Sequence, residues 1–147
     1  GVTQGPSSTG LLPCGGGAKV LTIRLEHKAR GVLNFSEFEV FSGDVNVARS
    51  GTATSSRQGW GGQAKRGIDG VKNYSHEVHT HNDNKSWWEL KLAEPTAVDK
   101  ILLHNRTTCC SNRMQNTTIT GKDAKGEVLW THDIKTNEKI YTITPGG

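Results

Sequence analysis

Short runs in which apolar and polar residues alternate recur along this chain, and no segment shows the apolar spacing of an amphipathic helix. In the clearest run, Trp88, Leu90 and Leu92 alternate with Glu89 and Lys91. Because successive side chains of a strand point to opposite faces, this pattern predicts a strand with one buried face. The chain is therefore expected to fold mainly as β-structure.

Further segments have the composition of strands. They cover residues 19–25, 32–41, 87–92, 98–103, 115–120, 127–131 and 139–144, with a short extended piece at 45–48. In the second segment Glu37 and Glu39 alternate with apolar neighbours, which predicts a half-buried strand. Pro95 is expected to end the strand that contains Trp88. Roughly seven or eight strands without a helix predict an all-β fold, a β-sandwich or jelly roll.

Two stretches read as loops. Residues 1–17 are rich in Gly, Ser, Thr and Pro and are expected to be a flexible lead-in or linker, leaving 18–147 as a single domain. Residues 50–67 are small and polar apart from Trp60, and they predict a long loop. Long loops in compact domains tend to carry function.

The charge pattern limits the partners of the chain. The formal net charge is +4, and the basic residues are scattered without a Lys/Arg run or interleaved aromatic residues, which argues against nucleic acid. An anionic polysaccharide or a membrane surface stays open. No apolar run approaches the roughly 20 residues of a membrane span. The absence of an initiator Met and of a signal peptide predicts a fragment or domain of a larger multidomain protein.

A loop with two adjacent cysteines follows the predicted strand 98–103. Cys109 and Cys110 are flanked by Arg106 and Arg113. Neighbouring side chains of one strand cannot both point into a core. The residues leave two interpretations open: the cysteines are bonded to each other as a rigid ring with an apolar sulfur face, or they are free thiols in a solvated loop.

The third cysteine, Cys14, has no partner if the other two pair with each other. Such a vicinal disulfide would indicate an oxidising compartment, hence a secreted, cell-surface or periplasmic protein. Glycosylation at Asn105 would fill the cysteine loop, so either this sequon is unused or the source cell lacks the modification. The Asn-x-Ser/Thr sequons begin at Asn34, Asn73, Asn84, Asn105 and Asn116.

Three histidines occur close together at residues 76, 79 and 81, which raises the alternative of a zinc site. The metalloprotease pattern requires two histidines four residues apart on a helix around a glutamate, and this segment has neither the spacing nor a helix. We therefore favour solvated loop positions for His76 and His81.

Three segments together, 64–70, 79–90 and 105–113, resemble the F-type lectins (fucolectins), a branch of the discoidin-like galactose-binding sandwich folds. The signature of that family is a His, a long spacer of fixed length, Arg-x-Asp, a short spacer and a second basic residue. Here residues 80–105 separate His79 from Arg106, and residues 109–112 precede Arg113. The resemblance extends over residues 46–120.

The resemblance implies a site for a fucose-type sugar. The two arginines of the motif would donate forked hydrogen bonds to ring hydroxyls, and His79 would hold a third hydroxyl. Cys109 and Cys110 would form a vicinal disulfide against the apolar edge of the sugar. Tyr74 or Trp60 would close over its methyl group.

The chain departs from the family pattern at several positions. Thr108 replaces the Asp of the signature, so a carboxylate that orients the basic residues is missing. A second disulfide of the family is absent, because Glu77 and Ser36 stand where its cysteines belong. Residues 33–40 resemble the last strand of the animal lectins, which implies that this chain is circularly permuted.

The family also implies a structural Ca²⁺ ion that holds the loops together without touching the sugar. By position, Asp69 and Glu37 would supply side-chain oxygens. Backbone carbonyls near Arg66, Val71 and His76 would complete the shell, and such oxygens suit a hard cation.

Fucosylated glycans or a fucose-containing polysaccharide are therefore the expected partners, and membranes are expected to be met only through surface glycans. A discoidin-like module for a sulfated polysaccharide, a galactose-type sugar or a phospholipid head group is the alternative. Catalysis is not expected, since no pair of carboxylates lies near the arginines in the sequence and Ser111 has no evident base.

Overall fold

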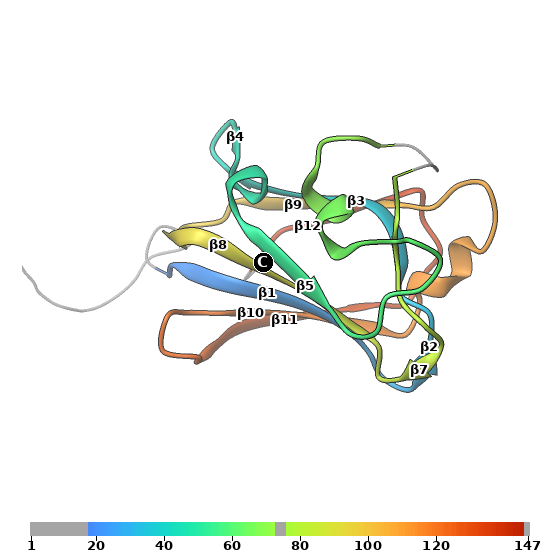
Figure 1. Ribbon diagram of the computed structural model, residues 1–147. Helices are drawn as coiled ribbons and strands as arrows, with labels where there is room; N and C mark the ends of the chain where they lie inside the picture. Colours follow the sequence, from blue (N-terminus) through green and yellow to red (C-terminus); the bar gives the residue numbers. More distant parts are fainter. Residues whose placement is uncertain (1–17, 73–75, 146–147) are drawn as a thin grey trace, which may run out of the picture.

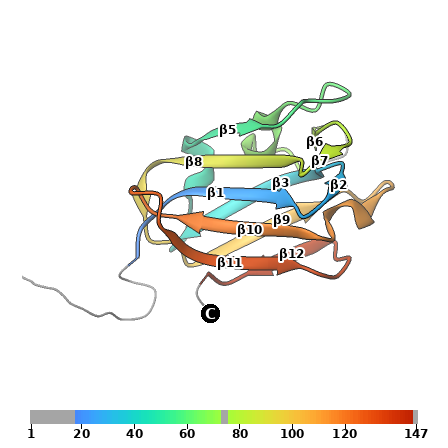
Figure 2. The same ribbon diagram turned by 90° about the horizontal axis from the view of Figure 1, so that it is seen from below.

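The computed structural model describes residues 18–72 and 76–145, which form two antiparallel sheets stacked as layers (Figures 1 and 2). One sheet has the strand order β11–β10–β1–β8–β5. The other has the order β12–β9–β3–β4, with β6 paired beside β3, and a separate ribbon joins β2 to β7. The predicted all-β sandwich is confirmed.

The strands agree with most of the predicted segments. Their bounds are β1 Val20–His27, β2 Arg30–Gly31, β3 Asn34–Ser42, β4 Val45–Asn46, β5 Thr52–Ser55, β6 Val78–His79, β7 Asp83–Asn84, β8 Trp87–Thr96, β9 Lys100–Asn105, β10 Thr117–Lys122, β11 Val128–Ile134 and β12 Ile140–Ile143. In the described part of the chain, three 3₁₀ helices lie between strands: η2 Val47–Ser50, η3 Ala64–Ile68 and η4 Ser111–Met114. The piece predicted as extended at 45–48 therefore splits into β4 and the start of η2.

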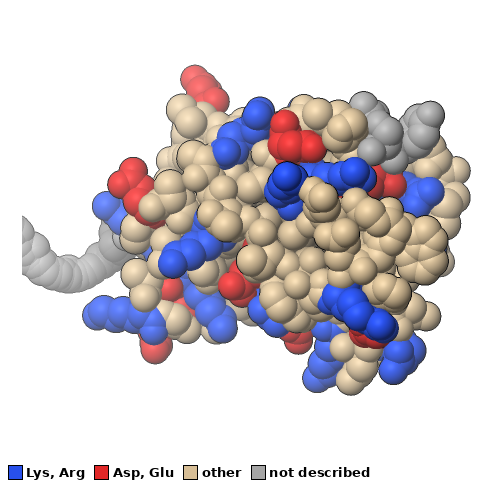
Figure 3. Space-filling view, in the orientation of Figure 1, with Lys and Arg blue, Asp and Glu red and all other residues tan. Residues whose placement is uncertain are grey.

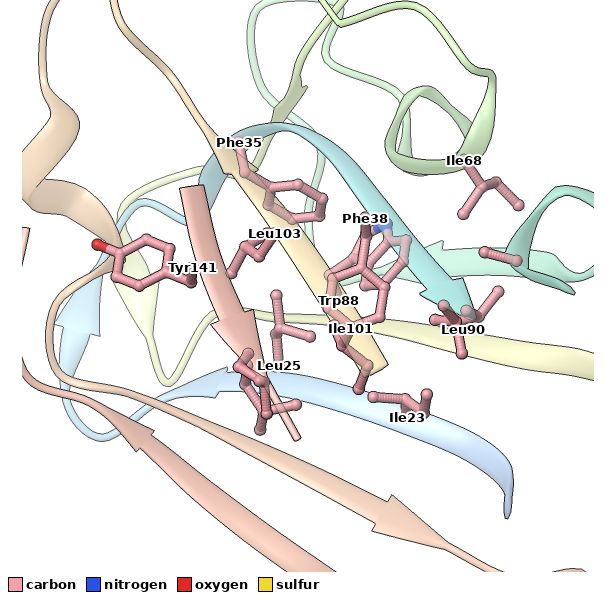
Figure 4. Packing of buried hydrophobic residues seen from close by; sticks show 14 of the residues in the cluster. Ile23, Leu25, Phe35, Phe38, Ile68, Trp88, Leu90, Ile101, Leu103 and Tyr141 are labelled. Carbon is pink, nitrogen blue, oxygen red and sulfur yellow. The ribbon is translucent and has the colours of Figure 1, made fainter. Parts of the chain in front are cut away.

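Aromatic rings from β3 and β8 fill the space between the two sheets (Figure 4). The ring of Trp88 lies 5.1 Å from that of Phe35 and 5.2 Å from that of Phe38, both edge-to-face. Its Nε1 donates a hydrogen bond to the Ala64 carbonyl at 2.9 Å. All three rings are fully buried, so truncating Trp88 to alanine would cost about 3–5 kcal/mol.

The strand β3 corrects the prediction of a half-buried strand over 32–41. It is buried on both faces, and Glu37 is 0% exposed despite its charge. Opposite β9, Phe35 pairs with Asn105 and Glu37 with His104, so β3 carries one extra residue, Ser36, as a bulge. A strand in the middle of a sheet and beneath loops does not show one-sided alternation.

The prediction of an uninterrupted loop over 50–67 was wrong. β5 pairs along β8, with Ala53 opposite Leu90, and η3 follows near the end of the segment. The Thr-Ala-Thr-Ser sequence of β5 has no large apolar side chain, so its pattern does not distinguish it from a loop. Backbone pairing at the sheet edge is what orders it.

Pro95 also does not end its strand, since β8 continues to Thr96. The pairing of β8 with β1 passes from Lys91 opposite Thr22 to Thr96 opposite Val20, with an irregularity between the two. The proline lies in this irregular stretch, where its missing N–H breaks no regular ladder.

Candidate functional site

The segments carrying the histidine and the two arginines meet at one end of the sandwich, beside the β2–β7 ribbon (Figure 1). His79 ends β6 and pairs with Asn34 at the start of β3. Arg106 follows β9 directly, and Arg113 lies in η4, which buried Met114 anchors to the core. The short strand β6 and the stretch from the end of β9 through η4 thus bring the three predicted side chains together.

Asn34 is the centre of this cluster, and the sequence did not point to it. Its Oδ1 accepts hydrogen bonds from Arg106 Nη1 at 3.2 Å and from Arg113 Nη1 at 3.1 Å. Its Nδ2 donates to the Val78 carbonyl at 2.8 Å, and the residue is fully buried. The amide is therefore fixed in orientation and holds the two guanidinium groups side by side. The only sequence signal was a polar residue between Leu33 and Phe35.

The imidazole of His79 has a defined hydrogen-bonding role. Nδ1 contacts the Thr80 carbonyl at 2.8 Å, and a carbonyl only accepts, so Nδ1 carries the hydrogen. Nε2 is then an acceptor and faces Nη1 of Arg113 at 3.3 Å. Burial lowers the pKa of His79 below its ordinary value, and the charges of Arg113 and Arg106 lower it further. The ring is thus neutral at pH 7.

Trp60 covers the outer side of this histidine. Its ring lies 5.0 Å from that of His79 and 5.7 Å from that of His81, and it is 79% exposed. The segment around it is tied to β6, because Gly59 N–H donates to the His79 carbonyl and His79 N–H donates to the Gly62 carbonyl. An exposed aromatic ring over a polar cluster can stack on an apolar ring face.

The cysteine loop lies between Arg106 and η4 in the chain. A disulfide joins Cys109 to Cys110, so the bonded interpretation holds for this structure. Cys109 is exposed and Cys110 half-buried, and the Cys110 carbonyl accepts from the Arg113 N–H at 3.0 Å. Asn105 anchors the loop through Nδ2, which donates to the Ser111 and Glu138 carbonyls. The disulfide therefore adjoins the arginine-bearing helix η4.

Arg106 has a second set of partners. Its Nε donates to Thr108 Oγ1 at 3.0 Å and lies 3.4 Å from Glu77 Oε1. Glu77 is buried, which raises the pKa of its carboxyl, while the charges of Arg106 and Arg113 oppose that rise. Sequence reasoning treated Glu77 only as the place of a missing cysteine. The sequence feature that could have indicated its role at the site is its position two residues before His79.

The residues predicted to hold calcium also lie together in part. Glu37 Oε2 accepts from the Gly70 N–H at 2.8 Å, and Asp69 Oδ1 accepts from the Val71 N–H at 2.9 Å. Oε1 of Glu37 is buried and has no hydrogen-bond partner among the described residues. Burial raises the pKa of Glu37 to about 8, and the Gly70 N–H opposes this while Asp69 adds to it.

Arg66, Asp69 and His76 line one hollow of about 510 Å³ beside this carboxylate pair. Within the described residues no cluster of three or more His, Cys, Asp or Glu could hold a metal by side chains alone. Glu37 and Asp69 offer oxygen donors, and such donors suit a hard cation like Ca²⁺ better than zinc, which structural sites hold mainly through Cys and His.

Tyr74 and Cys14, together with the predicted lead-in 1–17, lie outside the described residues. Of the predicted sequons, Asn34 and Asn105 are buried and hydrogen-bonded, so the folded chain cannot carry glycans there. Asn84 and Asn116 are exposed.

The face seen in Figure 3 shows basic and acidic side chains interspersed, without a continuous basic patch. Among the described residues, no helix is long and apolar enough to cross a membrane.

Comparison with known proteins gives several relatives. The chain is similar to fucolectin-3 of Anguilla japonica, with 36% identity over 83 residues that cover 50% of this chain and 46% of the fucolectin. Fucolectin-4 of the same species is 33% identical over 84 residues, covering 52% and 47%. A pentraxin fusion protein of Xenopus laevis is 32% identical over 99 residues, covering 64% and 24%. The chain thus spans less than half the length of each relative.

No solved structure gives a significant match. The family model described as the NedA-like, galactose-binding domain matches residues 66–147, more than half of the chain. The fucolectin matches and this family model agree with each other on a galactose-binding-like domain. The chain belongs to the NedA-like, galactose-binding domain family, and its sequence is similar to fucolectins.

Proposed function

We propose that the domain binds fucose-type sugars through His79, Arg106 and Arg113. The observation that carries this proposal is the convergence of the two guanidinium groups on Asn34 Oδ1, with Arg113 also 3.3 Å from His79 Nε2. Among the described residues, Nη2 of Arg106 and Nε and Nη2 of Arg113 have no protein partner, so these donors remain for ligand hydroxyls.

The walls of the cluster suit a deoxy sugar. The disulfide between Cys109 and Cys110 offers an apolar surface on one side, and the exposed ring of Trp60 offers another. The sugar would place its hydroxyls on the arginines and its methyl group against these surfaces. Hydrogen bonds to charged groups contribute about 1.5–3 kcal/mol each, and the cost of association offsets much of this. We therefore expect modest affinity for a single sugar.

A glycan array, run with and without chelator, tests the proposal. Fucosylated glycans should dominate the bound set, and calorimetry with free fucose should give one site per chain. Binding of sulfated polysaccharides or of phospholipid head groups without any fucosylated glycan would instead favour the other ligand classes of this fold. Trp60→Ala should weaken fucose binding without lowering the melting temperature, because its side chain is exposed.

We also propose a structural Ca²⁺ ion between Glu37 and Asp69. The support is a buried carboxylate oxygen, Glu37 Oε1, that no described group satisfies. Such an oxygen is costly unless a donor or a cation meets it. The carbonyls near Arg66, Val71 and His76 would complete the shell, and the ion would brace the η3 turn against β3.

Two further proposals concern the chain as a whole. A vicinal disulfide is typical of oxidising surroundings, so we propose a secreted, cell-surface or periplasmic location. We also propose that the strand order is circularly permuted relative to the animal lectins. In support, β3 comes from the front of the chain yet lies inside its sheet between β9 and β4, while the family model matches only from residue 66.

A further inference from the structure

The two arginines of the cluster create an electrostatic problem. They share one acceptor, Asn34 Oδ1, so their positive charges are held close together. Burial lowers the pKa of Arg113, and the neighbouring charge of Arg106 lowers it further. Two adjacent, partly buried guanidinium groups require a counter-charge to stay in place without a ligand.

Residue 108, where the family signature has an aspartate, does not supply this negative charge. Thr108, which stands at the Asp of the Arg-x-Asp signature, accepts from Arg106 Nε at 3.0 Å through a neutral hydroxyl. The hydroxyl can orient one N–H group, but it cannot balance two positive charges.

Glu77 is the carboxylate that meets the arginines instead. Its Oε1 lies 3.4 Å from Arg106 Nε, and among the described residues no other acidic side chain forms an ion pair with Arg106 or Arg113. It is 7% exposed, so solvent screens its charge little. Its charge also raises the pKa of Arg113, which means that the field of Glu77 reaches both guanidinium groups.

The fold fixes Glu77 on the same frame as the rest of the site. It directly precedes β6, whose residues Val78 and His79 pair with Phe35 and Asn34 of β3. The Val78 carbonyl in turn holds the Asn34 amide. The carboxylate, the shared amide and the imidazole are therefore placed by one short strand pairing.

We propose that Glu77 is a positioning residue that takes over the role of the absent motif carboxylate, holding Arg106 directly and Arg113 through its charge in the orientation that receives the sugar. This inference rests on the proposed sugar-binding function. The negative charge beside the two arginines is thus kept, but the carboxylate that carries it lies just before β6 and not in the cysteine loop.

The experiment is a rescue series read by calorimetry with free fucose at saturating calcium. Glu77→Gln keeps the shape of the side chain but removes the charge. We expect its fucose affinity to fall roughly tenfold or more, with little change in melting temperature. Adding Thr108→Asp to that variant restores a carboxylate at the motif position and should recover most of the affinity. A structural role alone gives no reason for such a recovery.

The matched control is Glu39→Gln, which neutralises another buried glutamate that pairs with His104 and Lys72 rather than with the arginines. Its fucose affinity should equal that of the wild type. Equal affinity of Glu77→Gln and wild type, or loss without recovery in the Glu77→Gln/Thr108→Asp double variant, would overturn the inference while leaving the sugar site in place. A wild-type protein that binds no fucose would defeat the proposed function, and this inference with it.

Discussion

The Nη1 atom of Arg113 lies 3.3 Å from the Nε2 atom of His79 although the two residues are 34 positions apart in the chain. The arginine is a donor only, and the carbonyl of Thr80 fixes the hydrogen of the imidazole on Nδ1, so the contact has one direction. A sugar hydroxyl that takes the place of this contact would accept from Arg113 and donate to His79 Nε2.

Replacing Arg113 with alanine should weaken fucose binding roughly tenfold or more, since one charged hydrogen bond contributes about 1.5–3 kcal/mol and about 1.4 kcal/mol is a factor of ten. The melting temperature should stay nearly unchanged, because the side chain is partly exposed and its loss also relieves repulsion with Arg106. Calorimetry and a thermal melt measure both. Lys122→Ala, which removes a positive charge from β10, is the control and should bind as wild type. Unchanged affinity in the Arg113 variant would remove this residue from the site.

Fucose affinity should fall as the pH drops below 6.5, the ordinary pKa of a histidine side chain. Burial and the nearby arginines lower the pKa of His79, so the neutral, accepting ring persists above that value. Protonation turns Nε2 into a donor that faces Arg113 and adds a third positive charge. The free energy of unfolding should change in the same direction. The unfolded chain takes up the His79 proton more readily than the folded chain, so the stability that neutral His79 contributes is present above pH 6.5 and is lost as the pH falls through the lowered pKa.

Titrations of the dissociation constant against pH, for wild type and for His79→Gln, measure this effect. The variant should bind more weakly and lose the part of the acid dependence that His79 causes, while the part that comes from the buried carboxyl of Glu77 remains. His81→Gln, which alters the other histidine beside Trp60, should keep the full acid dependence. An acid limb as large in His79→Gln as in the wild type would show that His79 does not cause it.

Mass spectrometry of the non-reduced protein should find Cys109 bonded to Cys110 and a single free thiol at Cys14. Replacing both loop cysteines with serine should weaken fucose binding severalfold, because the disulfide restrains residue 110, whose carbonyl accepts from the Arg113 N–H, and because the apolar sulfur surface is lost. The melting temperature should change little, since a ring closed between neighbouring residues restrains the unfolded chain only slightly. Two or three free thiols in freshly prepared protein would contradict the pairing.

Removing calcium should lower the melting temperature by several degrees. An ion that binds only the folded state stabilises it by about 2.7 kcal/mol at a hundredfold excess over its dissociation constant. Asp69→Ala should melt like the chelated wild type and should no longer respond to calcium. Sugar binding should weaken as well, because the η3 turn and the segment leading to His79 start at this site.

Glu37→Ala decides whether β3 has been assigned correctly in the proposed permutation. If it keeps the calcium response of the wild type while Asp69→Ala loses it, β3 does not contribute to the ion site, and the ligand assigned from the permuted strand order is wrong. Loss of the calcium response in both variants would agree with an ion held between Glu37 and Asp69.

Gly62→Ala should destabilise the fold and impair sugar binding together. A Cβ atom at this position would lie within 3 Å of the backbone of His79, so the Trp60 segment and β6 must separate. Overpacking of this kind typically costs about 1–3 kcal/mol. Gly61→Ala is the paired control: its φ of +70° strains alanine, but a Cβ there meets nothing within 4 Å, so fucose affinity should be affected less. Equal losses in the two variants would show that backbone strain, not the contact with His79, is responsible.

The sequence by itself determined the strands with a clear period of two, as in Trp88, Leu90 and Leu92, because side-chain alternation follows from strand geometry alone. It also indicated His79, Arg106 and Arg113, whose spacing is a property of one continuous stretch of chain. The edge strand β5 could not be predicted from the sequence, since it is held in place by pairing with β8 and its own residues show no strand pattern.

Only the tertiary structure decided how those three side chains are held. Asn34 lies 72 and 79 positions from the arginines it binds, and no local pattern connects residues at that separation. The same holds for the burial of Glu37 and for the ion pair between Glu77 and Arg106, which depend on loops packing over β3. Local periodicity determines most strands of this protein. The hydrogen bonds and ion pair that hold the site side chains form only after folding brings residues distant in the sequence into contact.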